Sequence, residues 1–150
     1  MPVNAHRLFD WHSSLPKTRS GSLTSKHPNV ALLETLDLSD LASAKELFSP
    51  DVVWHYVNPN LPEMEGAYKG LEGIRDFFRR LGEKSTGTFT VQPISAAAHG
   101  DELVVTHTKN TMTMEGETFA IHAVVVWRFV EGRIVEAWDF PSTYTLADMP

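Results

Sequence analysis

The sequence predicts a single α+β domain in which helices come first and antiparallel strands follow. Apolar residues recur at helical spacing over residues 28–48 and again over 70–82. Residues 88–140 instead form runs of alternating, β-branched and aromatic residues, joined by short turns that contain glycine. Short connections of this kind favour antiparallel pairing of consecutive strands. Helices followed by strands indicate an α+β fold and not a parallel α/β sheet.

The chain divides into two parts, an N-terminal arm over residues 1–27 and a folded domain over residues 28–150. Serine, glycine and proline break the arm at residues 13–16 and 20–22, which favours loop. The arm either docks loosely on the domain or covers the mouth of a pocket or a partner subunit. Both interpretations remain open.

The elements of the domain follow from local signals. Pro28 suits a first helical position, and two short amphipathic helices are expected between it and Pro50, which ends the second. Residues 52–57 are expected to form a strand, followed by a loop at 58–62 whose prolines cannot continue a ladder. A third helix begins near Gly70. The strands expected after it span residues 88–98, 103–114, 117–130 and 134–140.

Composition excludes several classes of function. The net charge of −6 and the pI near 5.6 argue against a nucleic-acid partner and against binding to an anionic membrane surface. The chain has no cysteine, which excludes disulfides and thiolate chemistry. Its longest apolar run, 123–127, is far too short to span a bilayer, and no signal-peptide pattern is present. The seven histidines lack metal-ligand spacing, so neither a metal nor a cofactor is expected, and the expected location is cytoplasmic.

Three stretches carry a resemblance to a known family. They are LASAKELFSPDVVW at 41–54, YKGLEGIRDFF at 68–78 and VWRFVEGRIVEAWD at 126–139. In order and spacing they resemble the nuclear transport factor 2-like superfamily, which includes ketosteroid isomerases and small polyketide cyclases. The resemblance implies a cone-shaped, curved antiparallel sheet wrapped around helices, a cystatin-like α+β roll. It also implies an interior pocket for a small apolar or aromatic ligand, and a homodimer packed through the outer face of the sheet.

The catalytic residues of the isomerases do not carry over. By resemblance, the catalytic base falls on Tyr56, the second acid near Val125 and the helical tyrosine near Leu32. None of these residues is of the required type, so the isomerase arrangement of an ionised base with two neutral donors is not expected.

A different set of polar residues remains for proton transfer. The resemblance places Asp139 on the concave side of the last strand, where neighbouring aromatic residues would raise the pKa of its carboxyl. Small polyketide cyclases resemble this arrangement, with an aspartate late in the sheet that removes an acidic proton. If one face of the 103–114 strand is concave, His107 lies beside Asp139 as its partner, and Tyr56 donates a hydrogen bond to an oxyanion. The alternatives are that Asp139 accepts structural hydrogen bonds and that His107 is exposed or lies on the dimer face.

Five further residues are expected to contact the ligand. Strand alternation puts Trp54 and Asn58 on the face of Tyr56, and the resemblance puts Val125 and Trp127 inside. Phe77 lies on the apolar stripe of the third helix. Core packing explains the large apolar residues equally well.

Two functions from different classes therefore remain open. The first is a cofactor-free lyase or isomerase that performs proton transfer, cyclisation or dehydration on a small hydrophobic carbonyl compound. The second is a non-catalytic small-molecule binding or scaffold protein of the same fold, because function depends on the site and not on the fold.

Overall fold

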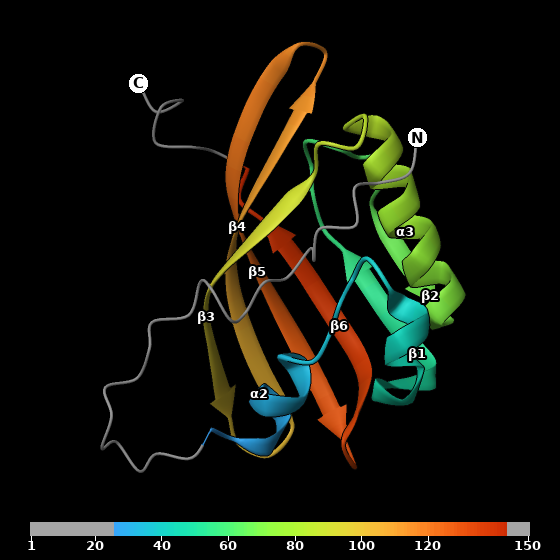
Figure 1. Ribbon diagram of the computed structural model, residues 1–150, viewed down its shortest axis with the longest axis vertical. Helices are drawn as coiled ribbons and strands as arrows, with labels where there is room; N and C mark the ends of the chain where they lie inside the picture. The colour runs from blue at the N-terminus through green and yellow to red at the C-terminus, as the bar shows by residue number, and fades with distance from the viewer. Residues whose placement is uncertain (1–25, 144–150) are drawn as a thin grey trace.

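The computed structural model of the chain describes residues 26–143, so nearly all of the expected N-terminal arm lies outside the described residues. Helical segments come first and a group of long strands follows, in the order that the sequence predicts (Figure 1). The elements are α2 (Pro28–Leu33), the 3₁₀ helix η1 (Leu41–Leu47), β1 (Phe48–Tyr56), β2 (Gly66–Lys69), α3 (Gly70–Lys84), β3 (Thr90–His99), β4 (Leu103–Met114), β5 (Glu117–Val130) and β6 (Arg133–Pro141).

The strands form one curved, six-stranded sheet in the order β2-β1-β6-β5-β4-β3 (Figure 1). Strands β3 to β6 pair antiparallel with their neighbours in sequence, as predicted, and β2 pairs antiparallel with β1. Among the strands that the structure describes, only β1 and β6 run parallel, because the chain returns to β1 after the whole meander of β3 to β6. Register shifts in three of the strand pairs mark bulges, which bend a sheet. The α+β fold class with a curved sheet is confirmed, although the sheet is not wholly antiparallel.

Helix α3 packs against the concave face of the sheet over β1 and β2 (Figure 1). Its apolar stripe follows helical spacing and buries Ile74, Phe77 and Leu81. Phe77 lies against Trp54 of β1, with ring centroids 5.8 Å apart. The core of the domain therefore lies between α3 and the concave face.

Two local predictions differ from the structure. The second predicted helix is a 3₁₀ helix, in which Leu41, Ala44 and Leu47 are buried. Their spacing of three matches the three residues per turn of that helix. The strand β2 was not predicted, because three of its four residues are exposed and it carries no apolar alternation.

Candidate functional site

One cross-strand row on the concave face brings together the polar residues of the candidate site. Tyr56 of β1 is in register with Asp139 of β6, Asp139 with Val125 of β5, and Val125 with Thr106 of β4. All four side chains are buried. Residues in register on neighbouring strands point to the same face, so these side chains lie next to one another.

The carboxyl group of Asp139 is enclosed in this row, and the residue is only 8% exposed. Burial raises its pKa from an ordinary value of 3.8 to about 7, because the charged form loses its hydration. Within residues 26–143, the carboxyl oxygens have no hydrogen-bond or ion-pair partner, whereas the backbone carbonyl accepts from the Val57 amide at 3.1 Å. The alternative in which Asp139 accepts structural hydrogen bonds thus has no donor in the described part of the chain. A carboxyl group in this state can exchange a proton near neutral pH.

The phenol of Tyr56 is held in a defined orientation beside Asp139. The Asn58 amide donates to the Tyr56 Oη at 2.9 Å, and the Asn60 backbone amide donates to Asn58 Oδ1 at 3.0 Å. Burial raises the pKa of Tyr56 above its ordinary value of 10, and the charge of Asp139 raises it further, while the bond from Asn58 lowers it. Tyr56 therefore stays protonated, and its hydroxyl hydrogen has no acceptor among residues 26–143.

The expected pairing of His107 with Asp139 is wrong, because the two side chains lie on opposite faces of the sheet. The register between β4 and β5 is continuous from Leu103 to Met114, so no bulge changes the alternation. Thr106 is buried on the concave face, and His107 therefore points to the convex face. There its Nε2 lies 2.7 Å from His122 Nδ1. His122 lies on the convex side, as the sequence indicated.

The predicted ligand-contacting residues all lie on the concave side, but several pack against one another. The Trp54 and Trp127 ring centroids are 5.4 Å apart, and both residues and Phe77 are at most 1% exposed. The Trp127 indole N–H donates to Thr106 Oγ1 at 2.9 Å. Within residues 26–143 the Trp54 indole N–H has no hydrogen-bond partner. These aromatic residues form the floor of the concave face, and their contact with a ligand remains a prediction, as it does for Asn58 and Val125.

The sequence interpretation missed the inward-facing polar residues of β4. Thr106, Thr108 and Asn110 alternate with His107 and Lys109, and the two threonines are at most 1% exposed. The Thr108 hydroxyl donates to Asn110 Oδ1 at 2.9 Å. The alternation was visible in the sequence, but both faces of this strand mix apolar and polar residues.

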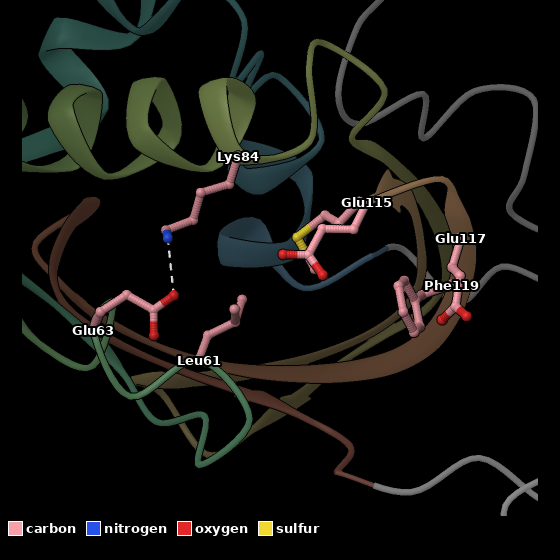
Figure 2. A pocket seen from close by; sticks show the side chains of 7 residues that line it. Leu61, Glu63, Lys84, Glu115, Glu117 and Phe119 are labelled. Carbon is pink, nitrogen blue, oxygen red and sulfur yellow. Dashed lines mark hydrogen bonds and ion pairs between the residues drawn. The ribbon is translucent and has the colours of Figure 1, made fainter.

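A cleft of about 440 Å³ opens at the end of the concave face where the β4–β5 hairpin turns (Figure 2). The loop before β2 and the end of α3 form its other walls, and an ion pair of 2.8 Å joins Lys84 to Glu63 across them. Neither Asp139 nor Tyr56 lines this cleft. Its lining residues are Leu61, Glu63, Lys84, Met114, Glu115, Glu117 and Phe119.

Within the part of the chain that the structure describes, no three histidine, aspartate or glutamate side chains come together as a metal site. Among the same residues, no helix has the length and hydropathy needed to cross a membrane.

Comparison with known proteins shows which family the chain matches. A family model described as the SnoaL-like domain matches residues 30–137. A protein of unknown function with a cystatin-like fold from Xanthomonas campestris is 23% identical, with a TM-score of 0.66, and the match covers 80% of this chain and 95% of that one. No curated protein matches the chain.

Two other solved structures share the fold. A protein assigned as a SnoaL-like polyketide cyclase from Jannaschia sp. CCS1 is 17% identical, with a TM-score of 0.62, over 85% of this chain and 92% of that one. TerC, co-crystallised with polyporic acid, is 20% identical, with a TM-score of 0.61, over 77% of this chain and 92% of that one. Identities this low establish the common fold alone.

Proposed function

Because the chain belongs to the SnoaL-like domain family of the nuclear transport factor 2-like superfamily, we propose that it is a cofactor-free enzyme that moves a proton on a small hydrophobic carbonyl compound. The observation that carries the proposal is a buried carboxyl group, Asp139, whose pKa is about 7, in register with the phenol of Tyr56. A polyketide cyclase assignment in one protein of the same fold and polyporic acid in another are consistent with a flat, oxygenated ligand.

The proposed reaction uses Asp139 as the base. Its carboxylate takes a proton from the carbon next to the ligand carbonyl, and the electron pair moves to the carbonyl oxygen to give an enolate. The hydroxyl of Tyr56 donates a hydrogen bond to that oxygen and stabilises the charge as it develops. Asp139 then returns the proton to another carbon. Alternatively, the enolate carbon attacks a second carbonyl and closes a ring, the electron pair of that carbonyl moves to its oxygen, and Asp139 gives its proton to the alkoxide that results. A pKa near 7 suits this role, because both protonation states are populated at neutral pH.

The proposed function is tested by ligand binding followed by isotope exchange. Flat phenolic and polyketide-like ketones are screened for a rise in Tm, since a ligand that binds only the native state stabilises it. Those that bind are incubated with the protein in D₂O, and NMR follows exchange of the proton next to the carbonyl. The proposal fails if ligands bind and no exchange or ring closure occurs, or if none binds.

The Tyr56→Phe variant is expected to exchange the ketone proton roughly 10- to 100-fold more slowly, because a hydrogen bond to a developing charge is lost. Exchange rates of the variant and the wild type are compared at saturating ketone. Tyr68→Phe is the matched control, since the Tyr68 hydroxyl donates to the Met64 carbonyl at 2.6 Å and lies outside the row of Asp139. Equal rates in wild type and Tyr56→Phe would remove Tyr56 from the mechanism.

A non-catalytic binding protein is the second candidate function. The observation that favours it is the close packing of Trp54, Phe77 and Trp127, which makes them a rigid apolar floor. In that case the cleft of Figure 2 holds the ligand by itself. Ligand-dependent stabilisation without any proton exchange distinguishes this function from catalysis.

The partner expected for the convex face is a second copy of the chain. Val57, Phe140 and Val124 lie side by side on this face and are 43%, 42% and 38% exposed. The nearby charges of Arg128 and Glu136 face each other within the chain at 4.0 Å. An apolar row of this kind suits a self-complementary interface.

The Phe140→Glu variant is expected to be monomeric at concentrations where the wild type is a dimer, because the carboxylate would be buried against its symmetry mate. Light scattering after size exclusion measures the mass of each. The control is Val130→Glu, which places the same charge at an equally exposed apolar residue beside the β5–β6 turn. A monomeric wild type, or an unchanged dimer in Phe140→Glu, contradicts this interface.

A further inference from the structure

The convex face of the sheet holds a pair of histidines that the proposed reaction does not use. His107 Nε2 lies 2.7 Å from His122 Nδ1, and the ring centroids are 4.9 Å apart. His107 is half-buried and His122 is exposed. Within residues 26–143 the second nitrogen of each ring has no hydrogen-bond partner. The two imidazoles therefore face each other with one nitrogen and solvent with the other.

Two neighbouring strands hold the pair in place. In the continuous antiparallel ladder of β4 and β5, His107 is in register with Val124 and His122 with Lys109. The two histidines are thus diagonal neighbours on one face of the sheet, at a separation that long side chains bridge. Because the backbone of both strands is hydrogen-bonded into the ladder, the rings are brought together before any ligand arrives.

The contact between the two rings is one that a metal ion can replace. A neutral imidazole carries one hydrogen, so one of the two facing nitrogens donates and the other accepts. If the donor ring shifts its hydrogen to the outer nitrogen by exchange with water, both facing nitrogens present a lone pair and no proton is lost. Two neutral imidazoles with facing lone pairs are ligands that divalent transition metals prefer.

The separation of the two nitrogens indicates the kind of metal. At metal–nitrogen distances of about 2.0–2.1 Å, nitrogens 2.7 Å apart subtend an angle of roughly 80–85° at the metal. This angle is near the value of about 90° in square-planar and octahedral sites, whereas a tetrahedral site needs nitrogens roughly 3.3 Å apart. The metal lies about 1.5 Å off the line between the nitrogens, so both rings turn towards it, the exposed one more easily. Tetragonal coordination by nitrogen and oxygen is typical of Cu²⁺ and Ni²⁺.

A positive charge lies beside the pair. Lys109 is in register with His122 and is exposed on the same face. Its ammonium group repels a divalent ion, although the flexible side chain can turn it towards solvent. Lys109→Gln is therefore expected to bind the metal about threefold more tightly than the wild type.

We propose that His107 and His122 form a bidentate site for one divalent ion of the copper and nickel type on each chain. Water fills the remaining positions, since the described part of the chain brings no third histidine, aspartate or glutamate to form a metal site. The ion links β4 to β5 and stabilises the native sheet. This inference does not depend on the proposed function, because Asp139 lies on the opposite face.

The experiment is a calorimetric titration of the untagged, full-length protein with NiCl₂ and, separately, with CuCl₂. It gives the number of ions per chain and the Kd for the wild type, His107→Gln, His122→Gln and the double variant. His99→Gln is the matched control, because His99 is an exposed histidine at the end of β3. Thermal unfolding in EDTA checks that every variant is folded before metal is added.

The wild type and His99→Gln are expected to bind one ion per chain, Cu²⁺ more tightly than Ni²⁺. Each single variant is expected to lose affinity about 100-fold and the double variant little more, because a chelate is lost with its first ligand. A wild-type Kd no tighter than that of the double variant means adventitious binding only and overturns the site. Wild-type affinity in either single variant, or a loss in His99→Gln as large as theirs, also overturns it. One ion per two chains contradicts a single-chain site, since a second copy would then supply ligands.

Discussion

The Asp139→Asn variant is expected to lose proton exchange by a factor of about 100 or more, and to be more stable than the wild type above pH 7. The loss of exchange follows because an amide cannot accept the proton. The gain in stability follows because the variant no longer buries a charge. The two effects have opposite directions, so a general loss of structure cannot produce both.

The pH dependence of the stability follows from the raised pKa of Asp139. The folded protein holds a proton on this carboxyl up to a pH of about 7, whereas the unfolded chain releases it near the ordinary value of 3.8. The native state thus binds more protons between these two values, and the free energy of unfolding falls as the pH rises through that window. The two pKa values of Asp139 differ by about 3, which corresponds to about 4 kcal/mol of the free energy of unfolding. This stability is lost in full only above pH 7. Below pH 4 the contribution of Asp139 is absent.

Urea unfolding of Asp139→Asn and wild type at pH 4, 6 and 8 measures this window. The difference between the two proteins is expected to grow with pH, in favour of the variant. Asp51→Asn is the control, because Asp51 is an exposed carboxylate on β1. A wild type that is as stable relative to the variant at pH 8 as at pH 4 would show that Asp139 ionises normally, and the proposed base would lose its support.

The Phe77→Ala variant is expected to lower the free energy of unfolding by about 3–5 kcal/mol. The Phe77 ring is fully buried and lies 4.8 Å from that of Tyr56 and 5.0 Å from that of Tyr68, between α3 and the sheet. Its removal leaves a cavity under the candidate site. Urea unfolding measures the loss, and Phe119→Ala, at an exposed ring, is expected to change stability by only about 0.5 kcal/mol. Similar losses in the two variants would contradict the position of the core.

The long strands were predictable because alternation persists over many residues. The predicted ranges of β4 and β5 agree with the structure at both ends, and glycine-containing turns separate them from their neighbours. Short elements gave no comparable signal. Strand β2 has four residues and an exposed edge, and η1 buries every third residue, a spacing that also fits part of an α-helix.

The face of a strand was harder to predict than its extent. Alternation separates Thr106 from His107 but does not say which of them faces the core. The structure buries the threonine, because its hydroxyl accepts the Trp127 indole N–H at 2.9 Å. That bond gives the buried indole N–H of Trp127 an acceptor on the concave face, and His107 lies on the convex face. A long-range hydrogen bond of this kind cannot be read from a local pattern.

That Tyr56 and Asp139 are neighbours could likewise not be predicted from the local sequence. Each was placed on the concave side by alternation and resemblance, but their register comes from the parallel pairing of β1 and β6. The residues that pair are 83 positions apart, as 139 minus 56 gives. Hairpin turns predict pairs of neighbouring strands, and they do not predict a pair so distant.

The parallel pairing of β1 with β6 also has a kinetic consequence. Closing a loop of this length costs more conformational entropy than forming any of the hairpins between β3 and β6. Contacts between distant segments slow folding, so we expect the β1–β6 ladder to form after the hairpins and to limit how fast the domain folds. Tyr56 and Asp139 meet only in that step. The chain therefore acquires its candidate site at the moment when the fold is completed, and a partly folded chain has no site to offer a ligand.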